Sequence, residues 1–290
     1  MSLDQLLQRA GASNARLLLA GGDTNRFPRV QERLHQAGHT HSQVVGASAP
    51  SPGGHPRLGD VATNLRQQKP ERVHDGIHAL DLAADPIRFA AGLAALGEAD
   101  AVVVGPGVTP AELADTAAWT HGPPPDGGLV HSATWLLSAD HGLLALADCS
   151  HAGTLAPDLR ARLALLVARA HEGVSGATPQ VAFLAGPEGL DGDEAAEAAL
   201  AALAGYDSGL VARVDRLVGF RGSGNVLIFP CGTSAHLASR FGRALGSAAL
   251  LGPLIMGPRG VMATVVEDAT EDEIVGTAAL AVLLAGRPNN

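Results

Sequence analysis

Short apolar runs alternate with amphipathic stretches along most of the chain. Unbroken apolar runs are typical of buried strands, and apolar residues three and four apart are typical of helices packed on a sheet. The runs expected to form strands are 15–20, 43–46, 101–105, 129–137, 142–148, 181–184 and 226–229. The stretches expected to form helices are 28–37, 85–96, 110–119, 157–170, 193–205 and 234–245, with a closing strand–helix pair over 261–286. This order predicts an α/β fold with doubly wound sheets in two lobes.

Two stretches interrupt the alternation. Residues 47–70 are mostly polar and rich in Gly, Pro and Ser, so 47–60 are expected to form a surface loop, and residues 74–82 alternate only weakly. Residues 122–128 (GPPPDGG) are the stiffest linker in the chain and mark the expected boundary between the lobes.

Two helix starts carry strong local signals. Thr109 is a typical N-cap, followed by Pro110 in the first turn and by Glu112 three residues after the cap. Thr270 and Glu273 repeat this spacing inside the acidic run 267–273. Acidic side chains in a first turn favour the helix dipole, so this run is interpreted as a helix N-terminus.

Composition narrows the class of protein. Of the 290 residues, 46% are hydrophobic but only 3% are aromatic, so the core must consist of small aliphatic side chains, which suits helices layered on a sheet. The net charge of −9 repels phosphate backbones, and nucleic-acid binding is not expected. Two cysteines are too few for a disulfide framework, which predicts a reducing, cytoplasmic location.

No membrane or secretory segment is expected. The N-terminus has an acid at Asp4 and lacks a basic stretch before an apolar one. The most apolar windows, 248–266 and 274–286, are interrupted by Gly, Pro and Arg or are shorter than the ~20 residues that a spanning helix needs. Both windows are interpreted as protein interior.

The sequence contains none of the strong catalytic or metal motifs. The phosphate loop G-x-x-x-x-G-K-[ST], H-E-x-x-H and C-x-x-C are absent, and the glycines of 219–224 (GFRGSG) precede a strand instead of following one. His35, His39 and His41 have no Cys or acidic residues spaced around them as ligands, so surface or loop histidines and no metal site are expected.

Two strand–helix junctions could bind a ligand. They are Val104–Thr109 (VGPGVT) and Phe229–Ser234 (FPCGTS), where small polar residues follow a buried strand. Open α/β sheets bind ligands where strand ends face helix starts. Spacing alone does not separate such a site from an ordinary, well-capped turn.

The order of these segments resembles the phosphate acetyl/butyryl transferase family, the phosphotransacetylases. ARLLLAGGDTNRFPRVQERL resembles the family's opening strand, "EG-D-R" loop and first helix. DPIRFAAGLAALGEADAVVVGPGVTPAEL is similar to its "DP-F-L-G-ADA-V-G-TT" segment, LLALADCS to its "ADC" strand, PQVAFLAG to its "P-VA-LS" strand and GNVLIFP to "ANVLIFP". GPLIMGPRGVMATVVEDATEDEIVGTAAL aligns without gaps with the closing "GP-L-G-KP-ND-SRG-S-DDIV" stretch.

The resemblance implies two α/β lobes, similar in architecture to isocitrate dehydrogenase, with a cleft in which coenzyme A and an acyl phosphate meet. The first lobe is expected to comprise residues 1–128 and 252–290, and the second residues 129–251. The family resemblance also implies a cytoplasmic homodimer, with coenzyme A as a substrate or ligand and no permanently bound cofactor.

Several positions depart from the family pattern. Val266 and Glu267 stand where the closing motif has Ser-Arg, and Asp115 stands where an arginine is typical. The Lys-bearing loop becomes 185–189, and the Gly-Asn after the opening loop becomes Ala235-His236. Only the acid later in the closing motif is retained, as Glu273.

These changes predict a degraded phosphate subsite. At about 4 Å and an effective dielectric near 20, one unit-charge pair is worth roughly 4 kcal/mol, so a reversed charge shifts phosphate binding by several kcal/mol. Arg88, Arg240 and Arg259 are available substitutes, although ordinary surface charge is the simpler interpretation of them.

Two functions follow from the resemblance. The first is acyl transfer between an acyl-CoA and phosphate or another acceptor, with Glu273 as the base for the CoA thiol. The residues expected to bind substrate are Thr109, Ser132, Thr233, Ser234, His236 and Arg259. The second is a non-catalytic relative that binds CoA, acyl-CoA or another metabolite and has a regulatory role.

Overall fold

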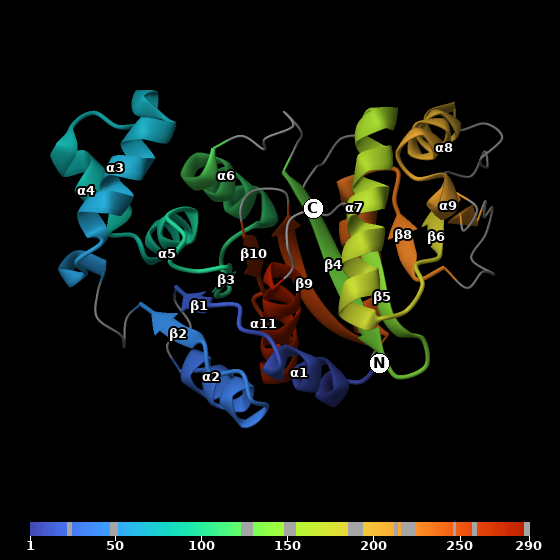
Figure 1. The fold of residues 1–290 in the computed structure, drawn as a ribbon, viewed down its shortest axis with the longest axis horizontal. Helices are drawn as coiled ribbons and strands as arrows, with labels where there is room; N and C mark the ends of the chain where they lie inside the picture. Colours follow the sequence, from blue (N-terminus) through green and yellow to red (C-terminus); the bar gives the residue numbers. More distant parts are fainter. Residues whose placement is uncertain are drawn as a thin grey trace. The chain divides into compact units, whose positions relative to one another are not determined.

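The computed structural model describes residues 1–21, 25–46, 52–122, 130–147, 155–184, 194–211, 214–215, 224–245, 248–256 and 260–286. The chain divides into two compact units. We call Leu3–Val130 with Leu254–Asn290 the terminal unit, and His131–Pro253 with Met1–Ser2 the central unit. Each unit is described separately (Figure 1).

The terminal unit surrounds a mostly parallel sheet with the strand order β2-β1-β3-β10-β9. Its strands are β1 (Leu17–Ala20), β2 (Ser42–Val45), β3 (Ala101–Val104), β10 (Val261–Thr264) and the second part of β9 (Ala248–Met256). Only β9 and β10 pair antiparallel. Its helices are α1 (Leu3–Gly11), α2 (Phe27–Gln36), α3 (Leu58–Gln68), α4 (Gly76–Ala83), α5 (Pro86–Ala95), α6 (Pro110–His121) and α11 (Glu271–Ala285), with short 3₁₀ turns at Pro52–Gly54 and Pro70–Arg72.

The central unit is built in the same way, with the strand order β4-β5-β8-β6-β7. Its strands are β4 (His131–Ser138), β5 (Gly142–Ala147), β6 (Val181–Phe183), β7 (Val214–Asp215) and β8 (Val226–Ile228), and the first part of β9 also belongs to this unit. The pair β4/β5 is antiparallel, and the pairs β5/β8, β6/β8 and β6/β7 are parallel. Its helices are α7 (Pro157–Ser175), α8 (Glu194–Tyr206), α9 (Ser208–Val211) and α10 (Gly232–Ala244), and α7 lies across β5 (Figure 1).

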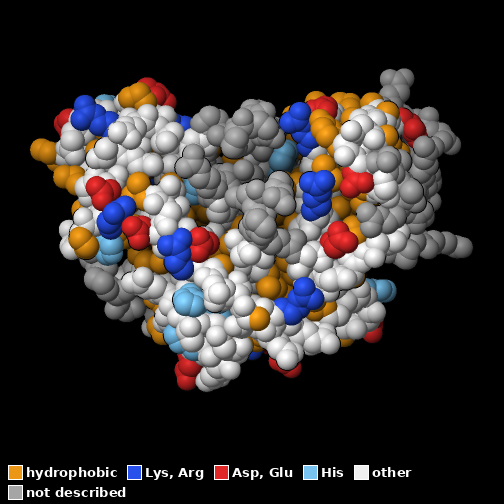
Figure 2. Space-filling view, in the orientation of Figure 1, with side chains coloured by type: hydrophobic (Ala, Val, Ile, Leu, Met, Phe, Trp, Pro, Cys, Tyr) orange, Lys and Arg blue, Asp and Glu red, His pale blue; other side chains and the backbone are white. Residues whose placement is uncertain are grey.

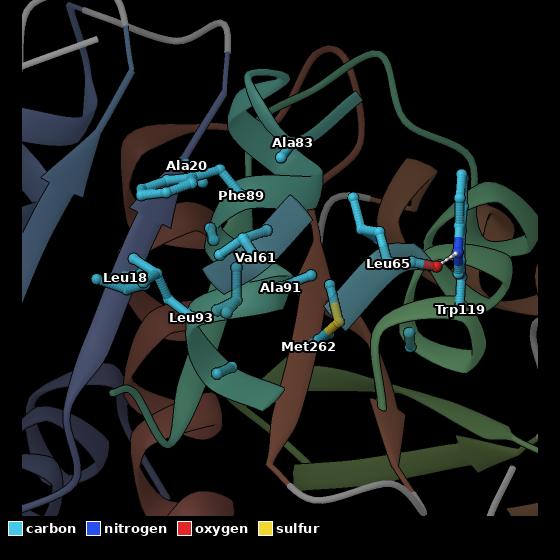
Figure 3. Close-up of a cluster of buried hydrophobic side chains, with 14 of the residues drawn as sticks. Leu18, Ala20, Val61, Leu65, Ala83, Phe89, Ala91, Leu93, Trp119 and Met262 are labelled. Atoms are coloured by element: carbon cyan, nitrogen blue, oxygen red, sulfur yellow. Dashed lines mark hydrogen bonds between the residues drawn. The ribbon is translucent and has the colours of Figure 1, made fainter. Parts of the chain in front are cut away.

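The hydrophobic cluster of the terminal unit consists mostly of Ala, Val and Leu side chains, as the composition leads us to expect, together with Phe89, Trp119, Ile255 and Met262. Leu18, Val61, Leu93 and Met262 meet there between the sheet and helices α3 and α5 (Figure 3). Trp119 closes one end of the cluster and donates its Nε1–H to the carbonyl oxygen of Leu65 at 2.9 Å, the dashed line in Figure 3. Because most of these side chains are small, the helices can lie close to the strands.

The predicted α/β class is confirmed, and the strand pairing is mixed, since the pairs β9/β10 and β4/β5 are antiparallel. The surface loop predicted at 47–60 is wrong for its last residues, 58–60, which begin helix α3, and residues 47–51 lie outside the described part of the chain. Helix α3 occupies part of the polar stretch, since Val61, Ala62 and Leu65 suffice to bury one face. The weak alternation of residues 74–82 belongs to helix α4, whose Asp75 N-cap accepts the His78 N–H at 2.8 Å.

No helix was predicted from the sequence at the position of α1, although this helix buries Leu6, Leu7 and Ala10. Among the described residues, no helix is both long enough and apolar enough to cross a membrane.

Candidate functional site

In the terminal unit, three parallel strands end together. Ala20, Val104 and Thr264 occupy the same register position on β1, β3 and β10. The Thr264 hydroxyl donates to the carbonyl oxygen of Val108 at 3.2 Å, which ties the end of β10 to the loop leading into α6. This carboxyl edge is where an open α/β sheet binds ligands.

Helices α6 and α11 begin beyond this edge with the same capping box. The Thr109 N–H donates to Glu112 Oε2 at 2.8 Å, and the Glu112 N–H donates back to Thr109 Oγ1 at 3.2 Å. Thr270 and Glu273 make the equivalent contacts at 2.8 and 3.2 Å. Both predicted helix starts are confirmed. Thr109 is exposed, whereas the proposed base Glu273 is only 3% exposed and uses Oε2 to cap its own helix.

The acidic run at the start of α11 pairs with helix α2. Arg33 Nη1 lies 2.6 Å from Asp272 Oδ1 and 3.8 Å from Glu271 Oε1, and Arg29 Nη1 lies 3.6 Å from Glu271 Oε2. The sequence interpretation of this run as a helix N-terminus is therefore confirmed, with α2 supplying countercharges that the spacing does not reveal.

Asp115, which replaces a typical family arginine, lies on α6 in a cationic setting. Arg72 contacts both of its carboxylate oxygens, at 2.6 and 3.1 Å, and Lys69 Nζ lies 3.5 Å from one of them. The hydrogen bonds from Arg72 hold the pKa of Asp115 below its usual value. Arg72 and Arg88 both lie over the ring of Trp119, at 5.2 and 5.8 Å from its centroid. Asp115 is therefore paired with two cations, Arg72 and Lys69, and Arg88 shares the Trp119 ring with Arg72.

In the central unit, the parallel strands β5, β8 and β6 also end together. Ile228 of β8 is level with Ala147 of β5 and with Phe183 of β6. Arg160, in the first turn of α7, is 1% exposed at this edge. Its Nη2 donates to the carbonyl oxygen of Leu184 at 3.1 Å, and its guanidinium carbon lies 5.5 Å from the centre of the Phe183 ring. A buried guanidinium at a strand edge is a strong binding element for anions.

Cys231 is the N-cap of α10 at the same edge. The thiol donates to Ser234 Oγ at 3.5 Å, and the Ser234 hydroxyl donates to the Cys231 carbonyl oxygen at 2.7 Å. The pKa of Cys231 is lowered by the Ser234 side chain first, then by the backbone N–H groups of Ser234 and Thr233 and by the charge of Arg160. A thiol in such a setting reacts readily as the thiolate.

The helix predicted over 234–245 is confirmed as α10, which starts two residues earlier, at Gly232. Thr233 and Ser234 therefore both belong to its first turn. Gly232 itself is buried. The first-turn N–H groups of a helix have no intrahelical partners and attract anions.

The other predicted site residues have separate settings. His236, on α10, accepts a hydrogen bond from Arg240 Nε at 3.0 Å, and burial followed by the Arg240 charge lowers its pKa. Ser132 is fully buried on β4. Arg259 lies outside the described residues.

The histidines expected at the surface include one that is buried. His39 has no exposed surface and its Nδ1 lies 3.2 Å from the carbonyl oxygen of Ser13, whereas His35 and His41 are exposed as expected. Burial lowers the pKa of His39. Within the part of the chain that the structure describes, no group of three His, Cys, Asp or Glu side chains could hold a metal ion.

Sequence reasoning missed Arg160 and Arg72. In the helix predicted over 157–170, the apolar residues at helical spacing are Leu159, Leu163, Leu166 and Val167. The structure buries Leu163 and Val167, leaves Leu159 and Leu166 half-buried, and buries Arg160 deeply. Arg160 stands three residues before Leu163 and seven before Val167, so an arginine in the core-facing row was the available signal. Arg72 gave no such signal, because its partner lies 43 residues away.

These observations define an α/β protein with two strand edges bordered by helix starts, and with Arg160 buried at the edge of the central unit, which is an arrangement suited to anionic ligands. The sequence model of the phosphate acetyl/butaryl transferase family matches residues 1–203. The chain belongs to this family. The matched range ends before β8, so α10 and the Glu273 segment lie beyond it.

The chain is also similar to known proteins over most of its length. The phosphate acetyltransferase of Paracoccus denitrificans is 26% identical over 292 aligned positions, which cover 88% of this chain and 90% of that protein. The fold is similar to that of a phosphotransacetylase from Streptococcus pyogenes, with a TM-score of 0.82, 16% identity and coverage of 98% and 99%. The EutD phosphotransacetylase from Staphylococcus aureus gives a TM-score of 0.78 at 14% identity, covering 98% of both chains.

Proposed function

We propose that this protein transfers an acetyl or other short acyl group between coenzyme A and phosphate. In the direction of acyl-CoA synthesis, the CoA thiol loses its proton and the thiolate attacks the carbonyl carbon of an acyl phosphate. The carbon–oxygen bond to phosphate then breaks, and inorganic phosphate leaves with the bonding electrons. The protein acts in the cytoplasm, as a homodimer, with CoA as a substrate and no resident cofactor.

The observation that carries the proposal is family membership. It is supported by groups in both units that can bind anions. Arg160 and the first turn of α10 border one edge, and Arg72, Lys69 and Arg88 gather in the terminal unit beside α6. CoA and acyl phosphates both carry phosphate groups that arginines and helix N-termini bind. In this proposal, residues 1–128 plus 252–290 form one lobe and residues 129–251 form the other.

The proposed roles follow the family resemblance residue by residue. Glu273 is the base that takes the thiol proton. Thr109, Ser132, Thr233, Ser234, His236 and Arg259 bind the substrates. Val266 and Glu267, in place of the family's Ser-Arg, leave the phosphate subsite degraded, so turnover is expected to be slow or to use an altered acceptor.

One observation favours a second candidate, a regulatory protein that binds CoA or acyl-CoA without catalysis. The Glu273 carboxylate is buried and already accepts the N–H and the hydroxyl of Thr270, at 2.8 and 3.2 Å. Hydrogen bonds to the charged form make a carboxylate a weaker base. A family member whose Glu273 is held in this way could still bind CoA without catalysing acyl transfer.

The test is release of CoA from acetyl-, propionyl- and butyryl-CoA, with and without phosphate, followed with a thiol reagent. We expect slow, phosphate-dependent release that Glu273→Gln abolishes. Gln is accepted at this position of a capping box, so the variant removes the base while keeping the helix start. Glu112→Gln is the matched control, because Glu112 makes the same contacts on α6.

The outcomes separate the two candidates. Loss of activity in Glu273→Gln alone supports the acyltransferase. Equal loss in both variants shows that the capping boxes matter only for folding, and full activity in both removes Glu273 as the base. If no acyl-CoA is turned over while acetyl-CoA binds in a calorimetric titration, the regulatory candidate replaces the enzyme.

A further inference from the structure

His39 is a buried titratable side chain that the proposed reaction does not use. It follows α2 without any exposed surface, and its backbone N–H donates to the carbonyl oxygen of Leu34, in the last turn of that helix, at 2.9 Å. Its Nδ1 lies 3.2 Å from the carbonyl oxygen of Ser13, just after α1. The two helix ends are tightly packed, because an added Cβ at Gly11 would clash with the carbonyl oxygen of Ala37. The His39 ring therefore joins the ends of α1 and α2.

The contacts of the His39 ring fit only its neutral form. A carbonyl oxygen can only accept a hydrogen bond, so Nδ1 must carry the hydrogen that faces Ser13. In the neutral ring, Nε2 then carries no hydrogen. Nε2 is buried, and no group among the described residues makes a hydrogen bond with it. A second proton on Nε2 would therefore bury both a charge and a donor without an acceptor.

In the described part of the chain, the charges that act on His39 have the same sign as its own cation. They belong to His35, in the last turn of α2, and to His41, just before β2, whose ring centroid lies 6.2 Å from that of His39. From the segment after α1, the group that meets the ring is the Ser13 carbonyl. Burial is the largest cause of the lowered pKa of His39. The Ser13 hydrogen bond opposes it, and the charges of His41 and His35 add to it.

Protonation therefore favours an arrangement in which the His39 ring is exposed to water. An exposed histidine has a pKa of about 6.5 and the buried ring has a lower one, so the exposed ring binds a proton first as the pH falls. Above about pH 6.5 the buried arrangement is unaffected, and each pH unit below that value favours the exposed arrangement by up to about tenfold. The end of α2 is the element that has to move for this exchange.

Helix α2 connects His39 to the start of α11. Helices α1, α2 and α11 pack against one another in the terminal unit (Figure 1). Leu34, which accepts the His39 N–H, adjoins Arg33, whose Nη1 lies 2.6 Å from Asp272 Oδ1 in the first turn of α11. Glu273 is the next residue and caps this turn. Release of His39 loosens the last turn of α2 and with it an ion pair that steadies this capping box.

We propose that His39 makes the start of α11 sensitive to acid: on protonation it leaves its place between α1 and α2, the last turn of α2 loosens, and Glu273 loses part of its support. This change takes place within the terminal unit and needs no ligand. Its effect on turnover rests on the proposed function, in which Glu273 is the base. His39 is then a positioning residue, and acid lowers activity through it.

The test is hydrogen–deuterium exchange of the full chain, followed by mass spectrometry at about pH 7.5 and about pH 5.5, with exposure times adjusted to the intrinsic exchange rate. We expect the last turn of α2 and the first turn of α11 to open on the order of tenfold more often at the lower pH. Helix α5 of the same unit is the internal reference and should show no such rise, because it does not depend on the end of α2.

Two variants remove the proton-binding group. His39→Gln is uncharged at both pH values, and its amide can still donate to the Ser13 carbonyl, so the acid response should disappear. His39→Leu also lacks the titrating group, and it keeps the measurement possible if the interior does not accept an amide. His171→Leu is the matched control, because His171 is a buried histidine on α7 of the central unit, and it should leave the response unchanged.

The outcomes are distinct. A wild type without an acid response, a response that persists in both His39 variants, or an equal rise in α5 would each overturn the proposal. A response in α2 without one in α11 would overturn the link to Glu273. CoA release should decline below about pH 6.5 in the wild type and at a lower pH in His39→Gln. A protein that releases no CoA at any pH but keeps the exchange response counts only against the proposed function.

Discussion

At the scale of single residues, Cys231 is the side chain whose chemistry the fold changes most clearly. A cysteine thiol in water has a pKa of about 8.5, and helix N-termini and neighbouring arginines lower it. Cys231 has both, and the first cause of its lowered pKa is the side chain of Ser234. Its half-exposed position leaves the sulfur open to small reagents.

We therefore expect Cys231 to react with iodoacetamide with a pH midpoint below that of an ordinary cysteine. Ser234→Ala should move this midpoint upward, because it removes the largest of the stabilising contacts. Alkylation rates for the Cys231 peptide, followed by mass spectrometry across a pH series, measure both midpoints. A midpoint that stays the same in Ser234→Ala would show that the helix start or Arg160 dominates instead.

His171 affects stability through its protonation. It is 1% exposed on α7, and burial lowers its pKa to about 4. Below its unfolded pKa of about 6.5 the unfolded chain binds a proton that the folded chain does not, so stability falls as the pH drops toward 4. Since each pKa unit is worth about 1.4 kcal/mol, the full loss from this residue is about 3 kcal/mol.

The expected result is a steeper acid dependence in the wild type than in His171→Leu. The difference in unfolding free energy between the two proteins should be constant above about pH 7 and should shift in favour of the variant as the pH falls toward 4. Urea unfolding at several pH values measures this difference. If the two curves stay parallel throughout, His171 binds protons equally in the folded and unfolded states, and this account of its burial is wrong.

At the scale of elements, glycine controls how closely α3 and α5 pack. At Gly92, in the middle of α5, an added Cβ would lie 2.5 Å from Val61 Cγ1 on α3. Both residues belong to the buried part of the terminal unit. The contact is between two helices on the same core, so neither can shift freely.

We expect Gly92→Ala to destabilise the protein by about 1–3 kcal/mol through overpacking, although alanine is the better helix former. Gly59→Ala on α3 is the matched control, because a Cβ there meets nothing within 4 Å, and it should be neutral or stabilising. Adding Val61→Ala to Gly92→Ala should recover part of the loss. Urea denaturation measures all four proteins, and equal stability of the two glycine variants would contradict the packing argument.

Elements were predictable from sequence where their cause is local. The capping boxes at Thr109 and Thr270 depend on residues three positions apart, and both helix starts were placed correctly. Helix α4 was missed because its apolar residues Ile77 and Leu80 point into solvent, which removes the periodic signal of a buried face.

At the scale of the whole molecule, the site residues that sequence missed depend on tertiary contacts. Arg160 could be noticed only as a charge in a core-facing row, and the pairing of Arg72 with Asp115 joins segments far apart in the chain. On the face shown in Figure 2, Lys and Arg side chains lie beside Asp and Glu, so a net charge of −9 says little about any single site. The change at Asp115 looked like a loss of positive charge in the sequence, but the fold supplies cations around it.

This arrangement leads to a prediction about phosphate. If phosphate is a substrate and is attracted by the cations around α6, Asp115→Asn should lower the KM for phosphate, because it releases Arg72 and Lys69 from a competing carboxylate. Exposed ion pairs are worth at most ~1 kcal/mol, so the expected decrease in KM is about twofold to fivefold, and it should be smaller at high salt.

Asp60→Asn is the matched control, since Asp60 Oδ2 pairs with Arg57 Nε at 3.2 Å on the surface of the same unit. Phosphate-dependent CoA release at low and high ionic strength measures the change. Equal effects of both variants would indicate only a general change in charge, and a raised KM in Asp115→Asn would mean that the carboxylate orients Arg72 for the substrate instead of withholding it.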